Sequence, residues 1–169
     1  MTEIFYHYIS FPLGFLFLAK NTKGLIISKF VEDKKLPENW LSKLIKLDKY
    51  KFKYSPELFS QEIKLFNSYF RGKTADFSCV KIDLIFGSPW ERKVWLQTKK
   101  IPYGEVRTYK FIAEKLNSRG FRAVGRALGK NPLLIIIPCH RVIKTDGSIG
   151  GFSAGIKLKK YLLKLEKIF

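Results

Sequence analysis

The sequence has few of the residues that build a disulfide framework, a metal site or a membrane span. It holds two cysteines and two histidines in 169 residues, and Cys79 and Cys139 stand in no Cys/His cluster, so neither a disulfide scaffold nor a structural zinc site is expected. The longest apolar run, Phe11 to Ala19, is far shorter than the roughly 20 residues of a membrane helix, and no Lys or Arg precedes it as in a signal peptide. We therefore expect a cytoplasmic protein with no metal and no membrane partner.

Acidic residues are also scarce, because 14 of them face 32 Lys and Arg, which gives a net charge of +18. Disorder is excluded by 46% hydrophobic and 15% aromatic residues. The charge is uneven: residues 1–83 carry +5 and residues 84–169 carry +13. Such an excess is compatible with mere solubility, with an anionic membrane surface or with nucleic acid. Its concentration in one half favours nucleic acid, whose phosphates supply affinity without sequence preference.

The first half of the chain has the pattern of a small sheet followed by helices. Aromatic and β-branched runs separated by turn residues predict an antiparallel meander of strands at 4–9, 15–18 and 25–31. Apolar residues near a 3.6 period predict helices at two further segments, one from Pro37 to about Leu47 and one from Ser55-Pro56 to Gly72. Residues 79–86 are interpreted as a short strand or linker. The composition changes there, so we place domains at 1–83 and 84–169.

The second half is predicted to be mostly helical. Ser88-Pro89 marks a helix start, and Thr108 can cap a short helix over 109–116. A turn at 117–120 separates it from another helix over 121–128, and this pair fits a helix-turn-helix. The second helix of the pair carries Arg122 and Arg126, where a DNA-facing surface is expected. Short helix pairs also occur in proteins that never bind DNA.

Cys139 stands in an unusual place. An apolar strand is expected over 133–137, and it leads into Pro138-Cys139-His140-Arg141. An adjacent base or cation favours the thiolate, which is the form that attacks carbon electrophiles. Cys79 lacks such neighbours and is interpreted as a buried, inert hydrophobic residue. The residues alone thus predict a reactive cysteine beside a DNA-binding element.

This half resembles the O6-alkylguanine-DNA alkyltransferases. The resemblance lies in the run 131–143 around Pro138-Cys139-His140-Arg141, and in further segments of matching order and spacing: 90–95, 101–105, 108–109, 122–125, 147–155 and 159–166. It implies an α+β protein. The N-terminal part would be an antiparallel sheet with helices, in a ribonuclease H-like layout, and the C-terminal part a mostly helical, winged-helix-like domain with a helix-turn-helix.

The resemblance also implies an activity and a role for individual residues. The protein would act as a monomer on double-stranded alkylated DNA, taking the alkyl group from O6-alkylguanine, and also from O4-alkylthymine, in one irreversible turnover without a cofactor. Cys139 would accept the group, His140 would act as base through a water, Glu166 would orient His140, and Tyr109 would assist nucleotide rotation and protonate the leaving guanine. Arg122 would fill the space of the flipped base. The remaining implied contacts are Ala123, Arg126 and Thr108 for DNA, and Asn131, Val142, Ser153, Phe152 and Gly150 for the substrate pocket.

Three positions depart from the pattern typical of the family. Leu134 replaces a common Pro, Phe152 a common Tyr and Ala154 a common Gly. We expect the first to change the shape of the pocket, the second to remove a phenol hydrogen bond to guanine, and the third to narrow the range of adducts accepted. Two other functions stay open. An alkyltransferase-like protein would bind alkylated DNA without repairing it, although such proteins lack the cysteine. A basic helix-turn-helix regulator would use Cys139 only for structure.

Overall fold

The computed structural model describes residues 2–34 and 49–169. The chain forms two compact units, Met1–Phe86 and Gly87–Phe169. We predicted a boundary between residues 83 and 84, three residues before the point where these units meet. The helix predicted from Pro37 lies outside the described residues.

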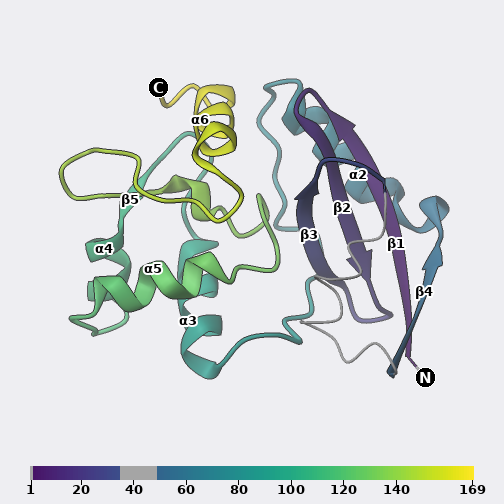
Figure 1. Ribbon diagram of the computed structural model, residues 1–169, viewed down its shortest axis with the longest axis horizontal. Helices are drawn as coiled ribbons and strands as arrows, with labels where there is room; N and C mark the ends of the chain where they lie inside the picture. The colour runs from purple at the N-terminus through teal and green to yellow at the C-terminus, as the bar shows by residue number, and fades with distance from the viewer. Residues whose placement is uncertain (1, 35–48) are drawn as a thin grey trace. The chain divides into compact units, whose positions relative to one another are not determined.

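The N-terminal unit is built on a four-stranded sheet in the order β3-β2-β1-β4 (Figure 1). The strands β1 (Thr2–Phe11), β2 (Gly14–Lys20) and β3 (Leu25–Val31) form the predicted antiparallel meander, with Tyr8 opposite Phe17 and Leu18 opposite Ser28. The fourth strand, β4 (Tyr50–Tyr54), pairs with β1 in parallel and was not predicted. Its two lysines alternate with aromatic residues, a pattern typical of a charged edge strand.

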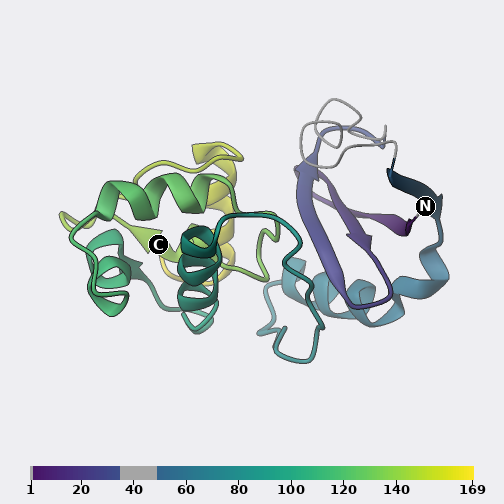
Figure 2. The same ribbon diagram turned by 90° about the horizontal axis from the view of Figure 1, so that it is seen from below.

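Aromatic side chains fill the core of this unit. A short 3-10 helix, η2 (Pro56–Phe59), leads into α2 (Ser60–Phe70), which covers one face of the sheet (Figure 2). The rings of Phe11 and Phe70 stack with their centroids 4.8 Å apart. The segment after α2 returns to the sheet, where the backbone of Leu25 pairs with that of Lys81 and Asp83. Cys79 is exposed, so our interpretation of it as a buried residue was wrong. Its neighbours Ser78 and Asp76 make polar turn contacts, which keep this stretch at the surface.

The C-terminal unit contains the predicted helix-turn-helix, and the predicted α+β fold class is confirmed. Helix α3 (Pro89–Thr98) begins with a capping box between Ser88 and Glu91. Helices α4 (Tyr109–Lys115) and α5 (Phe121–Gly129) form the pair, and the Thr108 hydroxyl caps α4 by accepting from the Phe111 amide at 3.0 Å. The buried indole of Trp95 donates to the Ala127 carbonyl at 2.8 Å and joins α3 to α5.

The apolar run before Cys139 is a buried turn, so the strand predicted over 133–137 was wrong. The Ile137 amide donates to the Leu133 carbonyl at 2.8 Å, and Ile135 has φ +73°. Every residue from 131 to 143 is buried, so the apolar composition reflects burial and not strand pairing. A one-turn 3-10 helix, η3 (Cys139–Arg141), follows directly.

The last elements close the unit. Strand β6 (Val142–Ile143) pairs in parallel with β5 (Arg107–Thr108), and the chain ends after α6 (Ile156–Leu165). Among the helices of residues 2–34 and 49–169, none is long and apolar enough to cross a membrane.

Candidate active site

The thiol of Cys139 lies at the end of the buried turn, where Asn131 fixes it. The Asn131 amide nitrogen lies 3.1 Å from Cys139 Sγ and also donates to the Ile137 carbonyl at 2.8 Å. The amide oxygen of Asn131 accepts from the Leu133 backbone at 2.9 Å. A hydrogen bond donated to sulfur stabilises the thiolate relative to the thiol. One side chain therefore both shapes the turn and favours the reactive form of the cysteine.

A chain of buried polar groups continues from the residue after the cysteine. His140 Nε2 lies 2.7 Å from Glu166 Oε1, and both side chains are fully buried. Arg141 donates to both oxygens of the same carboxylate, at 2.8 and 3.0 Å, and to the Ile101 carbonyl at 2.7 Å. Two backbone segments are thus tied to the C-terminal end of α6.

This environment sets the protonation of both groups. Burial lowers the pKa of His140 and outweighs the opposing effect of Glu166, so the imidazole is neutral at pH 7. Burial alone would raise the pKa of Glu166. The hydrogen bonds from His140 and Arg141, together with the charge of Arg141, lower it to about 2, so the carboxylate is ionised. A neutral imidazole held by a carboxylate has the form that a general base requires.

Lys159 is a further buried charge beside the site. Its ammonium donates to the carbonyls of Val142 at 2.6 Å and Gly151 at 3.2 Å, and it lies 5.9 Å from the centre of the Tyr109 ring. Burial lowers the pKa of Lys159 to about 8, while a negative charge on Cys139 opposes the shift. Lys159 therefore joins the strand after the cysteine to the loop before α6.

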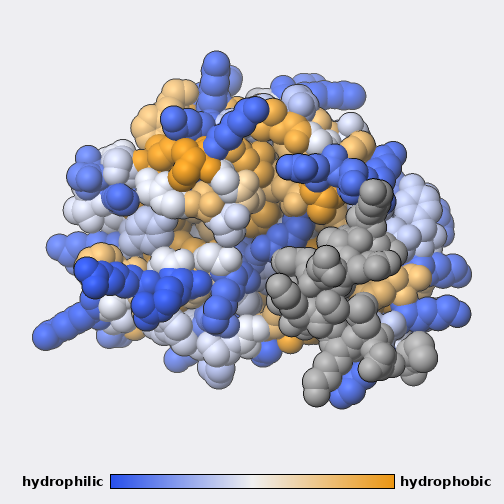
Figure 3. Space-filling view, viewed as in Figure 1, coloured by the Kyte–Doolittle hydropathy of each residue, from blue (hydrophilic) through white to orange (hydrophobic). Residues whose placement is uncertain are grey.

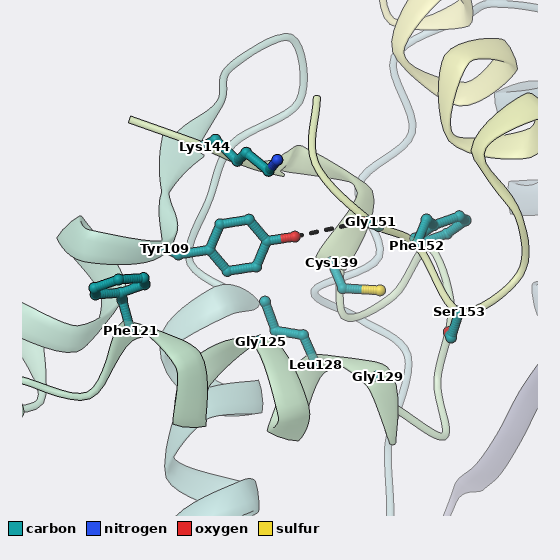
Figure 4. A pocket seen from close by; sticks show the side chains of 10 residues that line it. All are labelled: Tyr109, Phe121, Gly125, Leu128, Gly129, Cys139, Lys144, Gly151, Phe152 and Ser153. Atoms are coloured by element: carbon teal, nitrogen blue, oxygen red, sulfur yellow. Dashed lines mark hydrogen bonds between the residues drawn. The ribbon is translucent and has the colours of Figure 1, made fainter. Parts of the chain in front are cut away.

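Cys139 opens into a cavity of about 420 Å³, a volume in the usual range of small-molecule sites. Figure 4 shows the Tyr109 ring in the middle of the lining, with its hydroxyl toward Gly151 and the Cys139 sulfur beyond it. The cavity is lined by α4, α5, the active-site turn and the loop before α6, through Tyr109, Phe121, Gly125, Leu128, Gly129, Cys139, Lys144, Gly151, Phe152 and Ser153. The walls are mostly apolar, as for a site that receives a flat aromatic ring.

Tyr109 is held in place by the loop opposite it. Its hydroxyl donates to the Gly151 carbonyl at 3.4 Å. Gly150, with φ +70°, approaches the ring so closely that a Cβ there would lie 3.2 Å from Tyr109 Cε2, so a larger residue at this position would be strained. Burial, together with the charge of Cys139, raises the pKa of Tyr109 above its usual 10. The phenol consequently keeps its proton near neutral pH and is available as a donor.

The residues predicted to contact DNA lie together on the helix-turn-helix. Arg122 and Arg126 are exposed on α5, Ala123 between them is half-buried, and Thr108 caps α4. None of the four lines the cavity. Asn131 and Val142, predicted for the pocket, are buried behind its lining, whereas Phe152 and Ser153 line it directly. Of the other two departures, Leu134 is buried in the turn and Ala154 is half-buried in the loop.

The sequence analysis did not predict the roles of two buried residues near Cys139. Arg141 was treated only as a cation beside the cysteine, although it holds both oxygens of Glu166. Lys159 received no role, yet a signal was present: it shares the apolar stripe of α6 with Leu162 and Leu163, where a lysine must find buried partners. Within the part of the chain that the structure describes, no group of three or more His, Cys, Asp or Glu could hold a metal ion.

Comparison with known proteins accounts for both units. Residues 4–84 match the ribonuclease-like domain of 6-O-methylguanine DNA methyltransferases, and residues 89–168 match the DNA-binding domain of the same family. The chain is 40% identical to the methylated-DNA--protein-cysteine methyltransferase of Sulfolobus acidocaldarius, covering 98% of this chain and 94% of the relative. For the protein of the same name from Methanosarcina barkeri, the identity is 37%, with 97% and 98% covered.

A solved structure agrees with these matches. The Mycobacterium tuberculosis protein OGT in complex with DNA superposes with a TM-score of 0.80 at 34% identity, and the match covers 98% of this chain and 92% of that one. Both domains, their order and nearly the full length are shared. The chain therefore belongs to the methylated-DNA--protein-cysteine methyltransferase family, which repairs DNA by alkyl transfer to cysteine.

Proposed function

We propose that this chain removes the alkyl group from O6-alkylguanine, and also from O4-alkylthymine, in double-stranded DNA by irreversible transfer to its own Cys139. The observation that carries the proposal is the position of the Cys139 thiol. It lies at a cavity the size of a small-molecule site, it is held by Asn131, and the paired His140 and Glu166 follow it. A solvent-exposed cysteine such as Cys79 has none of these neighbours.

The chemistry is a displacement at saturated carbon. His140 takes the thiol proton through a water, and the bond from Cys139 Sγ to the alkyl carbon forms as the bond from that carbon to guanine O6 breaks. Guanine leaves as its neutral form because the Tyr109 hydroxyl supplies a proton, and such acid–base assistance contributes roughly 10²–10⁴ in rate. Glu166 stabilises the imidazolium that forms at His140.

We propose a single turnover without a cofactor. The product is a thioether, and none of the groups around Cys139 is a nucleophile placed to cleave it. Neither a redox step nor an external acceptor is needed, because the cysteine supplies the electron pair and retains the alkyl carbon. The chain would act as a monomer, and its cytoplasmic location stays a prediction.

Access to the lesion requires the nucleotide to leave the duplex, because O6 lies within the stacked bases. Arg122 would occupy the vacated space, and Tyr109 would guide the rotating phosphate. Thr108, Ala123 and Arg126 would contact the DNA backbone. The guanine edge would be bound by the protein backbone at Val142 and Ser153, with Gly150 and Phe152 completing the pocket. The net charge of +13 on residues 84–169 supports duplex binding that weakens with salt, with the adduct still chosen in the pocket.

Intact mass spectrometry tests this proposal. The protein is incubated with duplexes containing O6-methylguanine or O4-methylthymine, and we expect each chain to gain the mass of one methyl group. Cys139→Ser should gain none, while Cys79→Ser, the matched control, should gain one. Binding of the alkylated duplex without any change of mass would contradict repair and would indicate a binding protein or regulator.

A further inference from the structure

Phe121 is a large apolar side chain that the fold leaves exposed. It is 53% exposed at the first position of α5, whereas Val124, Ala127 and Leu128 of the same helix are buried. Its ring lines one end of the cavity, and Tyr109 lies between it and Cys139 (Figure 4). Packing in the core of the unit therefore does not explain why an aromatic residue stands at this position.

The surroundings of Phe121 are those of a surface that meets a polyanion. Arg122 is exposed directly beside it, and the first turn of α5 contains no acidic residue. Figure 3 shows long hydrophilic side chains extending outward over the helix-turn-helix. In helix-turn-helix proteins the first residues of the second helix are those that reach the bases. Phe121 thus stands where DNA is expected, at the entrance to the cavity.

The chemistry of a phenyl ring restricts what it can contact there. It has no hydrogen-bond donor for phosphate and no charge, so its favourable partner in DNA is the face of a base. Extrusion of a nucleotide creates such a face, since the bases beside the vacated position lose a stacking neighbour. Apolar side chains that enter base steps are a known means of stabilising such distorted duplexes.

We infer that Phe121 stacks on the base beside the extruded nucleotide, while Arg122 occupies the vacated position. The inference rests on the proposed function, and it assigns the two adjacent side chains different tasks. Arg122 provides charge and hydrogen bonds in the gap, and Phe121 replaces the lost stacking at its edge. Phe121 is thereby a positioning residue that favours the extruded state without touching the reacting carbon.

The first test compares Phe121→Ala, Phe121→Tyr and the wild type in single-turnover alkyl transfer. On a duplex containing O6-methylguanine we expect Phe121→Ala to be about tenfold slower, the loss of one stacked base, and Phe121→Tyr to keep nearly the full rate. With O6-benzylguanine as a free base, the loss for Phe121→Ala should be much smaller. The control is Leu96→Ala on α3, which removes a side chain of similar exposure (48%) away from the cavity and should not change either rate.

The second test removes the proposed partner from the DNA. Duplexes with an abasic site on the 5′ or the 3′ side of the lesion are compared with the intact duplex. On one of the two sides, loss of the base should abolish the difference between wild type and Phe121→Ala, because the coupling of the two groups is then gone. An equal loss for Phe121→Ala on all duplexes and on the free base would overturn the stacking role and leave repair standing. Failure of the wild type to transfer any alkyl group would overturn the proposed function as well.

Discussion

The two units of this chain bury polar groups in different ways. In the N-terminal unit the interior is largely aromatic and aliphatic, and the buried Glu62 pairs with a partly exposed lysine, Lys20, at 2.9 Å. In the C-terminal unit five polar or charged side chains are buried close to one cysteine: Asn131, His140, Arg141, Lys159 and Glu166. Burying charge is costly unless every group is paired. The second unit meets this condition by pairing its buried polar groups with one another and with backbone carbonyls around Cys139.

The largest difference between the units is expected when one buried carboxylate is neutralised in each. Glu166→Gln should slow alkyl transfer by about 10²–10⁴, because His140 loses the group that stabilises its charged form. It should also cost about 3–5 kcal/mol of stability, because the Arg141 charge stays buried without a counterion. Glu62→Gln is the matched control and should keep the rate within about twofold, with a cost of about 1 kcal/mol. Single-turnover rates and thermal unfolding measure both. Similar rates for the two variants would remove the distinction between the units.

A second comparison uses two asparagines that hold turns. Asn131→Ala should destabilise the protein by about 2–4 kcal/mol, because the buried backbone groups of Leu133 and Ile137 lose their partner. Asn21 caps a more exposed turn by accepting from the amides of Lys23 and Gly24, so Asn21→Ala should cost about 1 kcal/mol. Urea unfolding followed by circular dichroism measures the difference. Equal costs would show that the active-site turn does not depend on its asparagine.

The smallest expected effect concerns the pH dependence of alkyl transfer, for which the two histidines of the chain are compared. Because burial lowers the pKa of His140 from 6.5, and the charges of Arg141 and Lys159 add to this, the imidazole becomes protonated only below pH 6.5. The transfer rate should therefore stay level as the pH falls to 6.5 and then decrease by up to about tenfold per unit below the lowered pKa. His7→Gln in the other unit should not change the profile. A midpoint at or above pH 6.5 in the wild type would contradict a neutral His140.

Local signals allowed much of the fold to be predicted from the sequence. Strands with aromatic runs and helices with clear caps, such as Ser88 before α3 and Thr108 before α4, appear where their patterns indicate. The strand β4 was not predicted, because its alternation of aromatic residues with two lysines lies within a lysine-rich stretch. The run Leu133–Ile137 misled because apolar composition reports burial, whereas the turn depends on the side chain of Asn131, two residues before the run.

The residues predict Cys139 as a nucleophile, and the family resemblance implies His140 and Glu166 as its partners, but the buried contacts of Arg141 and Lys159 were not predicted. Cys139, His140 and Arg141 are adjacent in the chain, whereas Glu166 and Lys159 come from α6, and only the fold brings them together. Arg141 illustrates the limit well. From the sequence it is one more cation beside a thiol, whereas in the structure its guanidinium donates to both carboxylate oxygens of Glu166.

The most direct test of the account is where the alkyl group ends up. The wild-type protein is incubated with an excess of O6-methylguanine duplex, digested, and the two cysteine peptides are compared by mass spectrometry. We expect one methyl group per chain on the buried Cys139, none on the exposed Cys79, and no further methylation when fresh duplex is added. A methyl group on Cys79, or more than one per chain, would contradict this expectation.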